Sequence, residues 1–275
     1  MVLEFIVSGA LVGLIVGATG VGGGSLMTPL LTLAFGVPAQ VAVGTDLLFA
    51  SITKSGGAWT YARRGHVCWP IVAWLALGSG PAALLTLAAV HQWQPDAVQF
   101  NALLRPVLGL ALLLTAVAIA VQPQIRMLGA RAAAGSAAVF ATGDKASAIA
   151  TAGADGSLRP VQTLTVGALI GVLVTLTSVG AGAIGVVALL FLYPAMPARQ
   201  LVAADIAHAV PLTLIAGLGH VALGTVDWEM LLALLVGSLP AIHVGARLAG
   251  RLPERILRGL LASMLLLIGV RLLRV

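Results

Sequence analysis

Charged residues are scarce in this chain of 275 residues, because Asp, Glu, Lys and Arg together make up only 9% of it. An average soluble domain carries about 25% charged residues, so this chain has too few to cover a surface exposed to water. Hydrophobic residues make up 60% of the sequence, and the mean hydropathy is +1.08. Because a membrane-spanning helix needs about 20 apolar residues in a row, the sequence predicts an all-α polytopic membrane protein.

Cysteine and several catalytic motifs are also missing or rare. Cys68 is the only cysteine, which excludes an internal disulfide and a cysteine metal cluster within one chain. The sequence has neither a Walker lysine motif nor an H-E-x-x-H pair, so ATP-driven transport and intramembrane metalloprotease chemistry are not indicated. We therefore expect no enzyme activity, no cofactor and no metal site.

The basic residues do not indicate a nucleic-acid partner, although the net charge is +6. Most of them lie between apolar runs, where Lys and Arg orient a membrane protein. The first apolar run lacks a basic region before it and a clear cleavage site after it. We read it as a retained helix and not as a signal peptide.

The most distinctive feature of the sequence is a glycine-rich break inside its first apolar region. It comprises Gly20, Gly22, Gly23 and Gly24, followed by Ser25. Glycine costs a helix about 1 kcal/mol relative to alanine, so we expect the helix to stop here within the membrane. A similar break, 178–183, contains Ser178, Gly180 and Gly182.

The two breaks belong to a longer internal repeat. The segment 9–13 recurs as 167–171, and further Gly, Pro, Asp and Trp positions keep nearly the same spacing up to Ala241. This repetition predicts two homologous halves. We assign residues 1–121 to a first transmembrane repeat, 122–160 to a cytoplasmic linker rich in Ala, Gly and Ser, and 161–275 to a second transmembrane repeat.

The distribution of basic residues predicts that the halves are inverted. Arg63 and Arg64 follow the second long helix of the first half, whereas the equivalent loop of the second half, 224–229, has none. The next loop of the second half carries Arg247 and Arg251. If basic loops are cytoplasmic, equivalent loops lie on opposite sides. An inverted repeat is a common plan of secondary transporters. Each half would then contain a glycine-broken helix hairpin followed by three spanning helices.

At this point the chain resembles the sulfite exporter TauE/SafE family of prokaryotic membrane transporters. The resemblance rests on both glycine breaks, on the Gly44-Thr45-Asp46 segment and on residues 224–228, in order along the chain. It implies transport of small sulfur-containing anions, such as sulfite or an organosulfur acid, across the prokaryotic inner membrane. Many members of the family have a small residue where Asp46 stands, so the pair of Asp46 and Lys54 departs from the usual pattern.

The glycine breaks are the predicted anion site. A helix that begins at such a break exposes N–H groups and the positive end of its dipole, and glycine lets an anion approach them. The alternative is that the glycines only allow tight packing. Our predicted substrate-binding residues belong to the two breaks and to the helix after the first of them. They are Gly20, Gly22, Gly23, Gly24, Ser25, Thr45, Lys54, Ser178, Gly180 and Gly182.

Ionisable residues inside apolar spans suggest how transport is driven. Asp46, Asp205 and His208 are predicted to handle protons, because membrane carboxylates and histidines often form proton relays. A structural role is the alternative for all three, with Thr45 capping a helix at whose start Asp46 would lie. Lys54 either contacts the anion or only pairs with Asp46.

These observations predict a proton-coupled secondary transporter of a small sulfur-containing anion, held near the midplane of the membrane. The alternatives are an anion channel and a transporter of an unrelated small organic anion. The expected partners are the substrate anion and membrane lipid, and a homodimer is left open.

Overall fold

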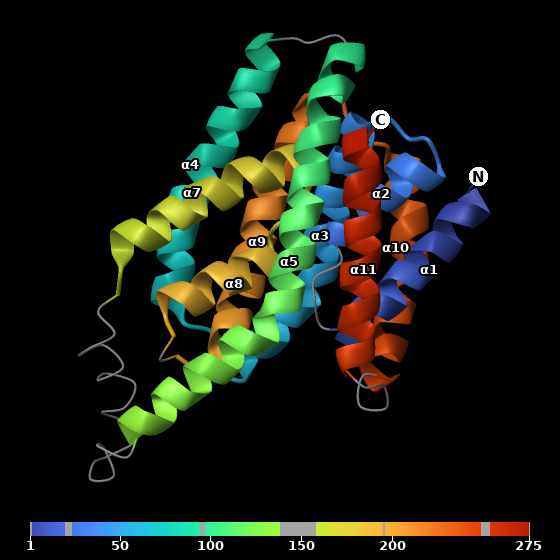
Figure 1. The fold of residues 1–275 in the computed structure, drawn as a ribbon. Helices are drawn as coiled ribbons and strands as arrows, with labels where there is room; N and C mark the ends of the chain where they lie inside the picture. Colours follow the sequence, from blue (N-terminus) through green and yellow to red (C-terminus); the bar gives the residue numbers. More distant parts are fainter. Residues whose placement is uncertain are drawn as a thin grey trace.

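The computed structural model describes residues 2–19, 24–93, 97–137, 158–194, 196–248 and 254–274 of the chain. Within these ranges the chain is helical apart from short connections and contains no β-strand. The helices form one bundle, shown in Figure 1. This agrees with the all-α architecture that the composition predicts.

Ten helices are described, five in each half of the sequence. The N-terminal half contains α1 (Val2–Thr19), α2 (Gly24–Ala34), α3 (Ala39–Arg63), α4 (Trp69–Trp93) and α5 (Ala97–Ala137). The C-terminal half contains α7 (Pro160–Thr177), α8 (Ala183–Leu192), α9 (Ala198–Ala222), α10 (Trp228–Leu248) and α11 (Glu254–Arg274).

Helix length and composition separate spanning helices from short ones. Five described segments are long and apolar enough to cross a membrane: Trp69–Trp93, Ala102–Ile125, Pro160–Thr177, Ala198–Ala222 and Trp228–Leu248. By contrast, α2 has 11 residues and α8 has 10. At 1.5 Å per residue these reach only about 15–17 Å, half of the hydrocarbon thickness. Each therefore ends within the depth of a bilayer.

Glycines bring the first helix of each half against the fourth helix of the other half. A Cβ on Gly13 of α1 would lie 2.6 Å from the carbonyl oxygen of Ser238 on α10. Likewise, a Cβ on Gly171 of α7 would lie 2.5 Å from the carbonyl oxygen of Ser79 on α4. Small residues allow backbones to approach closely in membranes, so these glycines are needed for the two helix pairs.

The centre of the bundle is formed by α3 and α9, which pack against each other. Gly44, near the start of α3, faces His220 at the end of α9 and Thr225 in the loop that follows. Gly57, near the end of α3, faces Ile206 in the first half of α9. The two helices are therefore antiparallel. The last helices of the two halves, α5 and α11, also pack together.

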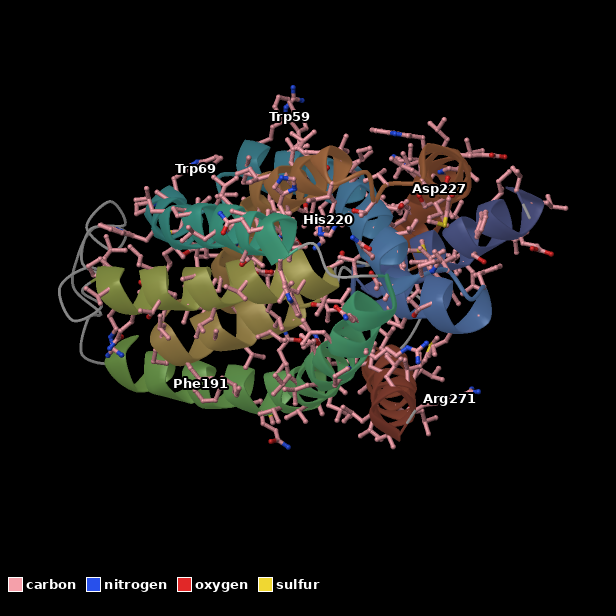
Figure 2. The ribbon with its side chains drawn as sticks, turned by 90° about the horizontal axis from the view of Figure 1, so that it is seen from above. Trp59, Trp69, Phe191, His220, Asp227 and Arg271 are labelled. Carbon is pink, nitrogen blue, oxygen red and sulfur yellow. The ribbon has the colours of Figure 1, made fainter. Side chains whose placement is uncertain are left out.

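The outside of the bundle is apolar. Trp59, Trp69 and Phe191 are each about 60% exposed, and Figure 2 places them on the periphery, with His220 among the helices. Arg63 lies over the Trp59 ring, with 4.7 Å between the guanidinium carbon and the ring centroid. Exposed aromatic residues near helix ends are typical of proteins surrounded by lipid.

Two helix boundaries differ from those that the sequence suggests. Helix α5 extends to Ala137, whereas we expected the spanning helix to end at Val121 and a linker to follow. Residues 122–137 contain mainly Ala, Arg, Leu and other good helix formers, which favour its continuation. Helix α3 begins at Ala39 with Pro38 as its N-cap. The expectation that Thr45 caps this helix is therefore wrong, because Thr45 and Asp46 lie almost two turns inside it.

Candidate functional site

Polar side chains gather in the centre of the bundle, where the break between α7 and α8 meets α3 and α9. We call this set the central polar cluster. Each member is at most 6% exposed in this apolar protein. The members are Thr28 on α2, Asp46 and Lys54 on α3, Ser79 on α4, Ser178 in the break, and Asp205 and His208 on α9.

The break between α7 and α8 has an unusual backbone. Helix α7 ends at Thr177, and Ser178 adopts the left-handed conformation with φ 57°. Gly180 and Gly182 have φ values of 121° and 138°, which side chains rarely tolerate. Helix α8 then begins at Ala183. The glycines are thus required for the path of the chain between the two helices.

Lys54 connects the first half of the protein to this break. Its Nζ donates a hydrogen bond to the carbonyl oxygen of Ala181, at 2.8 Å. The ammonium group also lies within electrostatic range of Asp46 and Asp205. A buried lysine is costly unless it is paired and hydrogen-bonded, so these three groups together explain why Lys54 can be buried at the break.

Asp46 is held from one side by α2. Its Oδ2 accepts a hydrogen bond from the Thr28 hydroxyl at 2.6 Å. Its Oδ1 is buried without a hydrogen-bond partner among the described residues, and so is the nearby Ser178 hydroxyl. Asp46 is therefore half satisfied and retains acceptor capacity towards the break.

Asp205 is the least satisfied member of the cluster. Neither of its carboxyl oxygens has a hydrogen-bond partner within the described part of the chain. Gly185 of α8 lies directly against it, so that a Cβ there would overlap Oδ1 of Asp205. Buried polar groups are normally hydrogen-bonded. Two orphaned carboxyl oxygens in one buried group indicate a place where a proton, a water or a ligand is expected to bind.

His208 lies one turn from Asp205 on the same face of α9. Its Nε2 forms a hydrogen bond of 2.8 Å with the hydroxyl of Ser79 on α4, and its Nδ1 has no partner among the described residues. The structure thus brings both acidic residues, Lys54 and His208 into one region, as a proton-handling site requires. Pro197 is the N-cap of α9, two turns before Asp205.

Thr45 has a different environment from its neighbour Asp46. Its hydroxyl oxygen accepts a hydrogen bond of 3.0 Å from the backbone N–H of Asp227, in the loop before α10. His220 is also bonded locally, to the Thr225 hydroxyl at 2.8 Å and to the Thr175 carbonyl at 3.1 Å. These contacts fasten the end of α9 and its loop to α3 and α7, which is a structural role.

The first glycine break is largely beyond the described residues. The structure does not describe Gly20, Gly22 and Gly23, so their role in binding remains a prediction. Gly24 and Ser25 are the first two residues of α2, and the Ser25 side chain is not among those described. Of the two breaks, the second lies among the described residues, with Ser178, Gly180 and Gly182.

Sequence reasoning missed two members of the cluster, Thr28 and Ser79. Ser79 carried a signal, because the Gly78-Ser79 pair recurs as Gly237-Ser238 in the second half. Thr28 carried none, since a threonine in an apolar helix usually bonds to its own backbone. Among the described residues, no group of His, Cys, Asp and Glu side chains could hold a metal ion.

Ionisable side chains buried among membrane-length helices, beside a break in those helices, are characteristic of membrane transporters. The comparison with known families agrees: the sequence model described as sulfite exporter TauE/SafE matches residues 5–272. The chain belongs to this family of membrane transporters. Members of this family are transporters and not enzymes.

Two relatives from Bacillus subtilis (strain 168) extend the comparison. The "Probable membrane transporter protein YjnA" is 33% identical over 99% of this chain and 100% of its own length. The "Probable membrane transporter protein YdhB" is 24% identical over 90% of each chain. No solved structure shows a significant match. These matches cover nearly the whole chain, so the protein is an integral membrane transporter.

Proposed function

We propose that this protein is a secondary transporter of a small sulfur-containing anion, such as sulfite or a related oxyanion or sulfonate, in the inner membrane of a prokaryote. The name of the family supports the class of substrate. The proposed binding site is the central polar cluster at the glycine breaks. One chain forms the proposed transport pathway, and the mass of the detergent-solubilised protein would reveal a homodimer.

The observation that carries this proposal is the position of Lys54. Its ammonium group is held at Ala181, between Gly180 and Gly182, where α8 begins. A helix N-terminus supplies only about half a positive charge, and Lys54 adds a whole one at the same place. An ammonium carries three N–H donors, and only one of them is used by Ala181. Cation and helix end together favour an anion at the break.

Asp205 is the proposed site of proton coupling, together with His208 one turn away on α9 and Asp46 on α3. An ionised carboxylate next to the break would repel an anion, whereas a protonated one can donate a hydrogen bond to it. Its two oxygens lack partners among the described residues, so protonation breaks no existing bond. Binding one proton with a monoanion would leave the net charge of the site unchanged. Substrate and proton would then be carried in the same direction.

The inverted arrangement of the two halves belongs to the same proposal. It is supported by the antiparallel packing of α3 and α9, which are equivalent helices of the repeat. It is also supported by two matching helix contacts. Gly13 of α1 lies against Ser238 of α10, and the corresponding Gly171 of α7 lies against the corresponding Ser79 of α4. The proposed cytoplasmic side is the end of the bundle that carries Arg63 and Arg64.

Counterflow of radiolabelled sulfite in proteoliposomes tests the function. Lys54→Ala should raise the KM for sulfite about tenfold, equivalent to about 1.4 kcal/mol of binding, and Lys54→Arg should retain part of the affinity. The charge-matched control is Arg64→Gln, which removes an exposed cation at the end of α3. Flux that neither saturates nor responds to a proton gradient would instead indicate an anion channel.

The rival explanation is that Lys54 and Asp46 form only a structural pair. Removing one partner of a buried pair costs about 3–5 kcal/mol, because a lone charge remains, while removing both can be nearly neutral. The double variant Lys54→Ala/Asp46→Ala separates the two explanations. If it recovers the wild-type KM and rate, Lys54 does not contact the substrate.

A further inference from the structure

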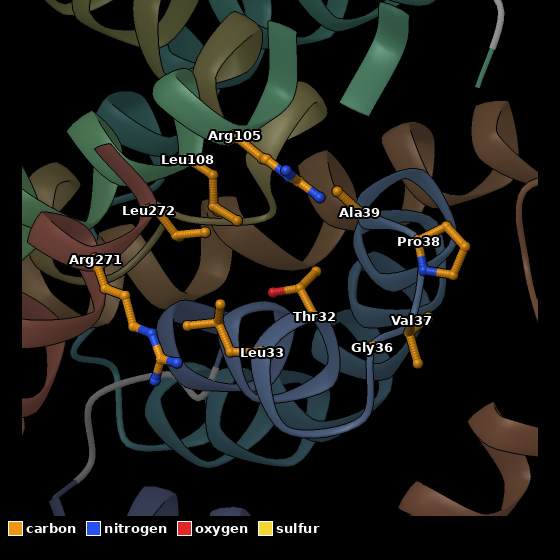
Figure 3. A pocket seen from close by; sticks show the side chains of 10 residues that line it. All are labelled: Thr32, Leu33, Gly36, Val37, Pro38, Ala39, Arg105, Leu108, Arg271 and Leu272. Carbon is orange, nitrogen blue, oxygen red and sulfur yellow. The ribbon is translucent and has the colours of Figure 1, made fainter. Parts of the chain in front are cut away.

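A second cationic feature lies away from the central polar cluster, at the end of the bundle opposite to Arg63. A cavity of about 380 Å³ opens there between α2, α3, α5 and α11. Arg105 of α5 and Arg271 of α11 line it together with Thr32, and none of its ten lining residues is acidic. Figure 3 shows the Arg105 side chain extending towards Ala39 and that of Arg271 towards Leu33, with Thr32 between them.

The electrostatics of this cavity favour an anion. Two guanidinium groups from different helices enter it, and the start of α3 at Ala39 adds the positive end of a 25-residue helix. No carboxylate among the described residues forms a salt bridge with Arg105 or Arg271. Guanidinium groups bind oxyanions through paired N–H donors. The volume exceeds that of one small oxyanion, so several waters of about 30 Å³ each could accompany it.

The cavity is connected to the central polar cluster through α2. Thr32 lines the cavity, and its hydroxyl donates to the carbonyl oxygen of Thr28, one turn deeper, at 3.0 Å. The hydroxyl of Thr28 in turn bonds Asp46. On α3, Ala39 lines the cavity and Asp46 follows seven residues later, about 10 Å deeper at 1.5 Å per residue. The cavity therefore lies directly above the buried cluster.

We propose that this cavity is a vestibule that binds a small hydrated oxyanion or sulfonate before it reaches, or after it leaves, the central site. Arg105 and Arg271 hold the anion by charge and raise its local concentration. The end of the bundle where the vestibule lies contains the connection between α2 and α3 and the C-terminus (Figure 1). This is the non-cytoplasmic side in the proposed topology. The vestibule rests on the proposed function, because it assumes that the substrate is an anion.

Cysteine modification tests the vestibule without requiring transport. Leu33→Cys, in a Cys68→Ser background in nanodiscs of neutral phosphatidylcholine, is treated with an anionic sulfonatoethyl and a cationic trimethylammonioethyl methanethiosulfonate. A cationic cavity concentrates the anionic reagent, which is itself a small sulfonate. We expect the anionic-to-cationic rate ratio to fall about tenfold in Arg105→Gln/Arg271→Gln, at the low end of electrostatic steering effects. Val37→Cys provides a second probe in the same cavity.

The controls separate this proposal from the proposed function. Arg64→Gln removes a cation from the opposite end and should leave the ratio unchanged, as should Lys54→Ala, which acts on the central site. Millimolar sulfate should slow modification of the cysteine at position 33 when both arginines are present. It should not slow this modification in the Arg105→Gln/Arg271→Gln variant. A ratio that does not respond to loss of the arginines at either probe overturns the vestibule.

A phospholipid headgroup offers the same phosphate chemistry as a free anion, so the lipid is varied in a separate arm. A vestibule for free anions predicts protection by sulfate in phosphatidylcholine nanodiscs and little change when phosphatidylglycerol is added without sulfate. If phosphatidylglycerol protects Leu33→Cys and sulfate does not, the cavity is a lipid site and the proposed vestibule is wrong.

Discussion

The two proposed repeats differ in chemistry at corresponding positions. In the proposed repeat, Asp46 of α3 corresponds to Asp205 of α9, and each lies against a short helix, α2 or α8. Asp46 accepts a hydrogen bond from Thr28 of α2, whereas the corresponding part of α8 contains Val186 and Val187, which cannot donate one. Asp205 is accordingly without a partner among the described residues. The proposed repeat would thus supply two carboxyl groups whose surroundings differ.

The ionisable residues near these two carboxyl groups also differ between the halves. Lys54 corresponds to Thr213 in the second half, and His208 corresponds to Phe49 in the first. The first half therefore contributes the cation, which bonds the Ala181 carbonyl in the break between α7 and α8. The second half contributes the histidine, which bonds Ser79 of α4. In the proposed inverted repeat, one asymmetric site of this kind would bind substrate and proton with different side chains. The predictions that follow compare equivalent or matched positions, beginning with the largest expected effect.

The break between α7 and α8 should be the position most sensitive to substitution. Gly182 has φ 138°, and a residue with a Cβ in such a conformation costs about 1–3 kcal/mol. Gly182→Val should abolish sulfite counterflow, because strain is added at the proposed anion site. The matched control is Gly56→Val, at an exposed helical position where an added Cβ meets nothing within 4 Å.

Gly23→Val extends the comparison to the first break. If both breaks contribute to one site, this variant should lose transport as Gly182→Val does, while both remain in the membrane. Normal sulfite uptake by the Gly182→Val protein would remove the second break from the proposed site.

Asp205 should matter more for proton coupling than Asp46. Asp205→Asn should retain sulfite counterflow and reduce gradient-driven uptake about tenfold, equivalent to about 1.4 kcal/mol, because the amide cannot load a proton. Asp46→Asn should reduce it less, since one oxygen of Asp46 is already bonded to Thr28. For cotransport, uptake by the parent protein should rise as the external pH falls. Equal losses in the two variants would contradict the asymmetry between the halves.

Much of the fold could be predicted from the sequence because glycine, proline and charge act locally. The second break lies between α7 and α8 as the spacing of Gly180 and Gly182 indicated, and Pro197 caps α9. Helix boundaries were less predictable where competing signals overlap. The Ala-, Gly- and Ser-rich composition after Val121 suggested a linker, but α5 continues to Ala137 because most residues there are good helix formers.

The candidate site could be predicted only in part. Residues that are unusual in an apolar helix, such as Lys54 and Asp205, are visible in the sequence because their burial is costly. Their partners are not: the acceptor of Lys54 is the backbone carbonyl of Ala181, which the identity of that residue does not reveal. Likewise, the roles of Thr28 and Ser79 depend on which helices pack together.

Ser79 and Ser238 offer the smallest and most closely matched comparison between the halves. Each lies against a glycine of the neighbouring helix, Gly171 or Gly13. The Ser79 hydroxyl bonds Nε2 of His208 at 2.8 Å, whereas the Ser238 hydroxyl has only a long contact of 3.4 Å to the Leu235 carbonyl.

Ser79→Ala should therefore lower the free energy of unfolding by about 1 kcal/mol more than Ser238→Ala, because it leaves a buried imidazole without its partner. A thermal shift assay on the purified protein in detergent measures this difference. Since Ser79 also orients His208 beside Asp205, Ser79→Ala should weaken the response of uptake to external pH, and Ser238→Ala should not. Replacing serine by alanine adds no volume at either helix contact, so a change seen only at position 79 reports the lost hydrogen bond and not altered packing. Identical stability and identical pH profiles for the two variants would show that the bond between Ser79 and His208 has no part in coupling.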